Sequence, residues 1–234
     1  MQASTSRTAL EVFSTLALPG TVRLGMTGEP VRRLPTGLPA LDAALDGGLP
    51  RGRVSEITGP VTSGKTALVF AALAAATQRG EFTALIDLPN ALHPAQAQSA
   101  GIALHHVLWV RPPTLAVGLR CAELILETKG FGLVALDLGA PRPRQLRAPM
   151  WPRVSRAAER AGAAVLIAAD RRVAGSCAAM SLAVAAHIRH WHRGAWPLFD
   201  GLTLHLTVAR NKLNAPGRRV ALRTAPTGPR RGDP

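Results

Sequence analysis

The chain has 234 residues, of which 47% are hydrophobic, and this fits one sizeable globular domain and excludes wholesale disorder. No apolar run reaches the roughly 18 residues of a transmembrane helix, the N-terminus lacks a signal-peptide pattern, and two cysteines are too few for a disulfide framework. We therefore expect a cytoplasmic protein without membrane contact.

The net charge of +14 is unevenly distributed along the chain. Residues 1–140 carry a net charge of +1, whereas residues 141–234 carry +13. A strongly basic second part favours an acidic partner, and nucleic acid is the first candidate. The alternative is a compositional bias toward arginine, because the chain is also rich in Ala, Gly and Pro and contains only three lysines.

Residues 1–33 are expected to form a short helix and an arm. Leu10, Phe13 and Ala17 fall at helical spacing, so residues 7–18 predict an amphipathic helix that ends at Pro19-Gly20. A helix of this length is not stable alone, and we expect it to dock on the body of the protein or on a partner.

Residues 34–224 alternate between strand and helix patterns. Strands are predicted at 53–59, 82–87, 105–110, 131–139 and 162–170, helices at 66–77, 95–100, 116–128 and 154–161, and further β segments in LAVAAHIRHW and GLTLHLTVARNK. This order predicts an α/β fold, with a mostly parallel sheet, helices on both faces and a C-terminal β extension. Residues 225–234 are rich in Pro, Gly and Arg and predict a disordered basic tail.

A phosphate-binding loop is predicted at residues 59–66. Their sequence, GPVTSGKT, satisfies G-x-x-x-x-G-K-[ST] between a predicted strand and a predicted helix. In that context backbone N–H groups form an anion-binding nest at the helix N-terminus. The nucleotide-binding candidates are Gly59, Thr62, Ser63, Gly64, Lys65 and Thr66.

Two of the residues in this region are candidate Mg²⁺ ligands. The hydroxyl of Thr66 would ligate the ion directly, as in other phosphate loops. Asp137 ends the apolar run LVALD, which is the place of the aspartate that holds the hydration shell of Mg²⁺ from a neighbouring strand.

The block LPTGLPALDAALDGGLPRGRVSEITGPVTSGKT (residues 34–66) resembles the core of bacterial RecA recombinases. The resemblance continues in the same order through LIDLPNALHPAQAQSAGI, LVALDLG, VLIAADRR and VARNKLNAP. It implies a RecA-like P-loop core, with ATP and Mg²⁺ as the ligands.

Three departures from the RecA pattern affect the expected ATPase cycle. Pro89 stands where RecA has the glutamate that activates water, so we assign no catalytic residue. Gln96 replaces a residue that holds adenine, and Asp170 replaces the glutamine that senses the γ-phosphate. Because loss of one positioned base costs about 10²- to 10⁴-fold in rate, we expect slow or absent hydrolysis and weak or vestigial nucleotide binding.

The resemblance also indicates where DNA contacts would lie. The two DNA-binding loops of RecA correspond to residues 141–153, which are basic and include Trp151, and to the short apolar stretch 171–181. Arginines interleaved with an aromatic ring suit single-stranded DNA. The alternative is a solvated loop in which Trp151 packs on the body of the protein. The candidate DNA contacts are Arg142, Arg144, Arg147, Arg153, Arg171 and Arg172.

Arg210 and Lys212 match two basic residues of RecA that reach across the subunit interface toward a neighbour's ATP. The match implies a surface that faces another subunit, either in a homo-oligomer or against a RecA-like partner. The alternative is an ordinary basic strand end. Together with Leu10 and Phe13, these residues are the candidate interface.

A RecA-like core with these departures is similar to the ImuA family, accessory proteins of bacterial mutagenesis cassettes. That resemblance implies a non-recombinase role in damage-induced (SOS) translesion synthesis, with an ImuB-like polymerase subunit, RecA and an error-prone polymerase as partners. It also implies association with the nucleoid when the protein is active. The alternative is an ATP-dependent recombinase or recombination mediator in which Asp87, or a neighbouring subunit, replaces the missing base.

DNA-stimulated ATP hydrolysis by the purified protein separates these alternatives. Because Pro89 cannot activate water, we expect the wild type and Lys65→Ala to show equal and negligible rates. Turnover that depends on Lys65 would contradict the accessory role and favour the recombinase.

Overall fold

The computed structural model describes residues 31–140, 150–192 and 198–224. Contacts divide the chain into residues 1–31 and 32–234, and the fold below is that of the second unit. The predicted N-terminal helix and basic tail lie outside the described residues.

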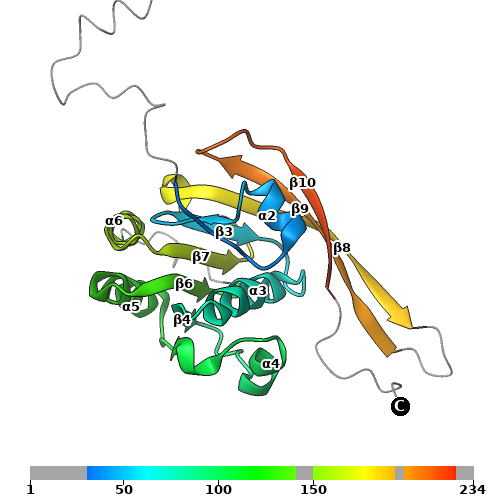
Figure 1. Ribbon diagram of the computed structural model, residues 1–234, viewed down its shortest axis with the longest axis horizontal. Coiled ribbons are helices and arrows are strands. Elements are labelled where there is room, and N and C mark those ends of the chain that lie inside the picture. Colours follow the sequence, from blue (N-terminus) through cyan, green and yellow to red (C-terminus); the bar gives the residue numbers. More distant parts are fainter. Residues whose placement is uncertain (1–30, 141–149, 193–197, 225–234) are drawn as a thin grey trace, which may run out of the picture. The chain divides into compact units, whose positions relative to one another are not determined.

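The second unit follows the expected alternation of strands and helices (Figure 1). Its elements are β1 (Arg33–Leu34), α2 (Pro39–Ala44), β2 (Leu49–Pro50), β3 (Val54–Thr58), α3 (Lys65–Gln78), β4 (Phe82–Asp87), α4 (Pro94–Ser99), the 3₁₀ turn η1 (Leu104–His106), β5 (Val107–Val110), α5 (Leu115–Thr128), β6 (Phe131–Asp137), α6 (Trp151–Ala161), β7 (Ala164–Ala169), the 3₁₀ turn η3 (Gly175–Cys177), β8 (Ala178–His192), β9 (Leu198–Asn211) and β10 (Arg219–Thr224). None of the described helices is long and apolar enough to cross a membrane.

A few predicted boundaries were wrong. His105 and His106, predicted within a strand, form the 3₁₀ turn η1, and the segment predicted as a loop up to residue 181 already enters β8 at Ala178. Helix α2 was not predicted, and its N-cap residue, Leu38, offers no side-chain cap. Its entry is fixed instead by Asp42, whose Oδ1 accepts hydrogen bonds from the backbone N–H of Thr36 at 2.8 Å and from its hydroxyl at 2.7 Å.

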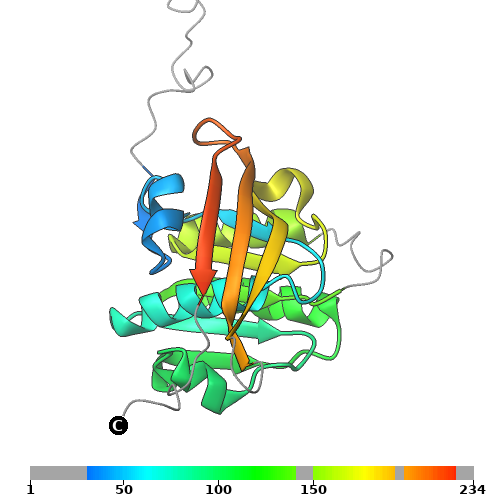
Figure 2. The same cartoon turned by 90° about the vertical axis from the view of Figure 1, so that its right-hand side faces the viewer.

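Eight of the described strands form one sheet in the order β10-β9-β8-β3-β7-β6-β4-β5. Neighbours from β8 to β5 are parallel, whereas β9 and β10 are added antiparallel. Figure 2 shows the added strands side by side. The predicted mostly parallel sheet with a C-terminal β extension is therefore confirmed. Because the parallel strands run in one direction, their carboxyl ends meet at a single edge, where ligands bind in such sheets.

Helices cover both faces of the parallel sheet (Figure 1). Residues of α2, α3 and α4 share one buried cluster with the inner face of β8, β9 and β10. The helices α5 and α6 share the second cluster with the opposite face of β4, β6 and β7. The strands β8, β9 and β10 therefore extend one core rather than forming a separate layer.

The corner between α2 and β2 requires a glycine at position 48. Gly48 has φ +118°, and a β-carbon there would lie 2.2 Å from the carbonyl oxygen of Leu34. Backbone cannot yield to that contact without separating β1 from β2, which pair Leu34 with Leu49.

We expect Gly48→Ala to lower the free energy of unfolding by more than about 2 kcal/mol, because it adds a steric clash to backbone strain. Gly217→Ala is the matched control, since Gly217 also has a positive φ (+94°) but no atom within 4 Å of the added β-carbon. The control should lose only about 1 kcal/mol in urea denaturation. Equal losses would contradict the steric argument.

Candidate nucleotide-binding site

The loop between β3 and α3 has the backbone of an anion-binding nest. Thr62 has φ +66° and Gly64 has φ +89°, so both adopt the left-handed conformation that turns N–H groups toward one point. Gly64 is the N-cap of α3, whose positive end favours an anion. The N–H of Gly59 donates to the carbonyl of Ala169 at 3.3 Å, which fixes the loop beside β7. The predicted phosphate-loop residues thus stand together at the carboxyl edge of the sheet.

Side chains of β9, in the C-terminal extension, lie against this loop. A β-carbon on Gly64 would lie 2.8 Å from a methyl of Leu204 and 2.9 Å from one of Leu202, both on β9. Leu204 is fully buried in the core under α3. A larger residue at position 64 would therefore displace the methyl groups of these two leucines.

Lys65 is held by the loop itself. Its ammonium donates to the carbonyls of Gly59 and Pro60, both at 2.6 Å, and to the hydroxyl of Ser63 at 3.4 Å. The residue is only 9% exposed, and this burial lowers the pKa of Lys65, whereas Asp137 and Asp170 act in the opposite direction. A phosphate group in the nest would compete with these carbonyls for the ammonium.

Asp137 ends β6 close to the first turn of α3. Its Oδ1 accepts the N–H of Gly139 at 3.0 Å. Burial raises the pKa of Asp137, and the nearby carboxylate of Asp87 adds to this effect, while Lys65 and the Gly139 hydrogen bond oppose it. The surroundings thus disfavour an unpaired negative charge on Asp137, which a bound cation would relieve.

A cavity of about 10 Å³ lies between Asp137, Asp87, Thr66 and Leu92. This is room for about one water molecule, and its oxygen groups are those that Mg²⁺ prefers. The described residues contain no cluster of three or more His, Cys, Asp or Glu that could hold a metal alone. The arrangement therefore fits Mg²⁺ held by Thr66 and Asp137 with water and phosphate oxygens, rather than by a protein cage.

The end of β4, where a catalytic base would stand, is a closed turn. Asp87 is 2% exposed, and its carboxylate accepts the N–H groups of Ala91 at 3.0 Å and Leu92 at 2.9 Å and the indole N–H of Trp109 at 3.2 Å. Pro89 lies in this turn, and a β-carbon on Gly139 would be 3.5 Å from its Cβ. Pro89 thus borders the strand that ends in Asp137, and Asp87 is a structural acceptor.

Asp170 follows β7 and is paired with its neighbour in the chain. Arg171 donates to the Asp170 carboxylate through Nη2 at 2.7 Å and Nε at 3.1 Å. The hydrogen bond from Arg171 is the main cause that lowers the pKa of Asp170, and Lys65 contributes in the same direction. Asp170 is therefore ionised at neutral pH.

Glu56 is a buried carboxylate that the sequence analysis missed. It lies on β3, is 0% exposed, and accepts the N–H groups of Val173 and Ala174, both at 3.1 Å, the hydroxyl of Ser181 at 3.0 Å and Nε of Arg172 at 3.3 Å. These bonds fix the chain that leaves β7 and returns as β8. The available signal was a lone acid inside the otherwise buried strand pattern RVSEITG.

The predicted DNA contacts are only partly brought together. Arg171 and Arg172 lie at the phosphate edge, in the ion pairs described above, whereas Arg153 lies on α6 and donates to Glu123 at 2.8 Å. Trp151 is 5% exposed and packs in the core. This agrees with the alternative that its ring packs on the body of the protein rather than against DNA bases. Arg142, Arg144, Arg147, Leu10 and Phe13 lie outside the described residues.

The two predicted interface residues, Arg210 near the end of β9 and Lys212 just after it, hold the turn η3. Arg210 donates to the carbonyl of Gly175 at 2.9 Å, and Lys212 donates to the carbonyl of Ser176. Both residues are thus joined to the segment that Glu56 anchors. Their role against another subunit stays a prediction.

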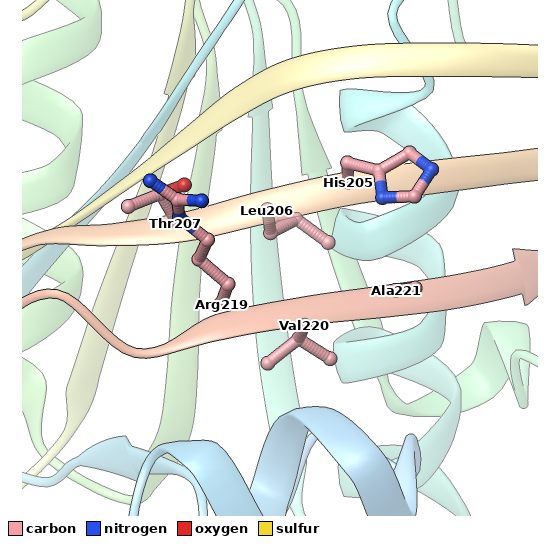
Figure 3. A pocket seen from close by; sticks show the side chains of 6 residues that line it. All are labelled: His205, Leu206, Thr207, Arg219, Val220 and Ala221. Carbon is pink, nitrogen blue, oxygen red and sulfur yellow. The ribbon is translucent and has the colours of Figure 1, made fainter.

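A broad hollow of about 470 Å³ lies over β9 and β10 (Figure 3). Cross-strand pairing places Thr207 beside Arg219 and His205 beside Ala221 on one face. None of its polar lining side chains is buried, so the hollow lacks the fixed polar groups of a small-molecule site. Its lining residues are His205, Leu206, Thr207, Arg219, Val220 and Ala221.

These features define a P-loop protein with a RecA-like sheet. The RecA N-terminal domain family matches residues 12–150, more than half of the chain, and the protein belongs to this family.

Curated relatives match over about half of the chain. RecA of Clavibacter michiganensis is 42% identical over 118 residues, and RecA of Leifsonia xyli is 41% identical over 118 residues, in each case 50% of this chain and 33% of the relative. RecA of Streptomyces ambofaciens is 38% identical over 110 residues, 47% of this chain and 30% of that protein. The chain therefore spans about a third of the length of these relatives.

The fold has a solved counterpart in the crystal structure of the RadB recombinase. The two are 17% identical with a TM-score of 0.62, and the match covers 81% of this chain and 95% of that chain. At this identity the likeness shows the RecA-like fold alone.

Because the pKa of Asp137 is raised, we expect Asp137→Asn to increase the stability of the fold by an amount that depends on pH. Protonation of a carboxyl whose pKa is raised by folding favours the folded state, and this contribution is lost as the pH rises through the folded-state pKa. At pH 7 the ionised carboxylate therefore destabilises the ligand-free protein. Asn keeps an acceptor for the Gly139 N–H and carries no charge, so we expect a larger free energy of unfolding at pH 7.

Urea denaturation of wild type and variant should show this difference shrinking as the pH falls to about 4. Asp200→Asn is the control, because Asp200 is in an exposed ion pair with Arg223 at 3.0 Å. A variant Asp137→Asn that is less stable than the wild type at pH 7 would contradict the argument.

Proposed function

We propose that this protein is a non-recombinase accessory protein of damage-induced (SOS) translesion DNA synthesis and mutagenesis, which acts by binding partners. The observation that carries the proposal is the end of β4, where a phosphate loop stands beside a turn that offers no free base. Pro89 cannot move a proton, and all three hydrogen bonds on Asp87 go to the chain itself.

The other acids at this edge also have assigned partners. Asp137 accepts the Gly139 N–H and is placed to hold Mg²⁺, and Asp170 is paired with Arg171. A general base must reach the attacking water by a hydrogen bond, and neither group has that role in this arrangement. The edge therefore supports nucleotide binding without efficient turnover.

ATP and Mg²⁺ are the ligands that the site fits. The nest and Lys65 would hold phosphate oxygens, and Thr66 and Asp137 would hold the ion, which supplies positive charge against the phosphates when bound. In our proposal this site is vestigial or regulates the contacts with partners.

The proposed partners are an ImuB-like polymerase subunit, RecA and an error-prone polymerase. Membership of the RecA N-terminal domain family supports a surface related to that of RecA subunits. We place the contact at the segment joined to Arg210 and Lys212 and at the predicted helix with Leu10 and Phe13. DNA bound by the basic second part of the chain would keep the complex at the lesion.

An ATP-dependent recombinase or recombination mediator is the second candidate. The complete phosphate loop favours it, as does the likeness in fold to the RadB recombinase. It needs a base supplied by a neighbouring subunit, because Asp87 is committed to the turn after β4.

Capture experiments with the purified full chain test the proposal. We expect it to capture RecA and the ImuB-like subunit in the absence of nucleotide, with Lys65→Ala unchanged within about twofold, because capture then depends on neither nucleotide binding nor turnover. Phe13→Asp should weaken capture by about tenfold or more, since an apolar anchor becomes a charge.

Thr15→Asp is the matched control, because Thr15 lies on the opposite side of the predicted helix from Phe13. It should capture both partners as the wild type does. Capture of neither partner by the wild type, together with unaltered RecA filament activity, would overturn the proposal.

A further inference from the structure

Asp170 stands directly beside the phosphate loop. In the parallel pairing of β3 and β7, Thr58 lies opposite Ala169, and the Gly59 N–H donates to the Ala169 carbonyl. Asp170 is the next residue after Ala169. The ammonium of Lys65 rests on the carbonyl of Gly59, so the acid and the lysine flank the first residue of the loop.

The charge on Asp170 is only partly neutralised. The Arg171 side chain is 53% exposed while that of Asp170 is 17% exposed, so the cation of this pair is largely in water and its effect is screened. The carboxylate and Lys65 also attract each other directly. Part of the negative charge of Asp170 therefore remains beside the phosphate loop, at the end of β7.

The backbone next to this acid is fixed. Glu56 holds the backbone of Val173 and Ala174 and the side chain of Arg172, which leaves little freedom immediately after Asp170. Because these bonds are buried, breaking them to move Asp170 would leave a carboxylate and two N–H groups without partners.

We propose that the phosphate loop selects a nucleoside diphosphate over a triphosphate, with Asp170 as the residue that sets this preference. The nest and Lys65 suffice for the inner phosphates, which a diphosphate presents fully. The third phosphate of a triphosphate would add negative charge close to the carboxylate of Asp170. The inference deepens the proposed function and rests on its nucleotide site, because a loop that favours the diphosphate suits binding without turnover.

The test is calorimetric titration of the full chain with ADP and with ATP at one Mg²⁺ concentration. Like charges several ångströms apart near a protein surface correspond to about tenfold in affinity, so wild type should bind ADP about tenfold more tightly than ATP. Asp170→Asn should reduce this ratio to about twofold or less. Arg171→Gln, which leaves the carboxylate unpaired, should widen it.

Asp200→Asn is the matched control, because it removes the same charge from another exposed aspartate–arginine pair, with Arg223. It should leave the ratio of the two affinities unchanged. Equal affinities in the wild type, an unchanged ratio in Asp170→Asn, or no binding of either nucleotide would each overturn the inference. None of these results bears on capture of RecA or the ImuB-like subunit, so failure here is distinguishable from failure of the proposed function.

Discussion

The buried carboxylate of Glu56 is the interaction on which the arrangement of this edge depends. It joins β3, the chain that leaves β7 and the start of β8 through contacts with Val173, Ala174 and Ser181. A carboxylate with no exposed surface is tolerated only because each contact is a hydrogen bond. The positions of Asp170 and of η3 both follow from it, since they lie in the segment that it anchors.

The acids around the phosphate loop have separate structural duties, and this is the basis of our proposal that the site does not turn over ATP efficiently. Asp87 organises a turn, Asp137 has a raised pKa beside a cavity with room for about one water molecule, and Asp170 is ionised beside an arginine. Hydrolysis requires an acid that is free to bond to water, whereas phosphate binding requires the nest and a cation. In our proposal residues 59–65 supply the nest and the cation.

The sequence predicted those parts of the molecule that depend on neighbouring residues. The strand at Phe82–Asp87 follows from a local pattern and was confirmed. The loop around Gly64 also follows from a local pattern and precedes α3 as expected, while its binding of phosphate stays a prediction. Contacts between distant residues were not predictable in the same way. Glu56 accepts the N–H of Ala174, which is 118 residues further along the chain. The indole of Trp109 reaches Asp87 only because β5 pairs with β4.

The support of Gly64 by Leu202 and Leu204 has a consequence for how the protein is made. The phosphate loop lies in the first third of the chain, but the strand that it contacts, β9, lies near the end. Contacts between residues so far apart form late in folding, since the intervening chain must first be ordered. During synthesis from the N-terminus, the nest can therefore reach its final shape only after β9 has left the ribosome and paired with β8. Nascent chains that end before β9 should hold the loop sequence without its binding geometry.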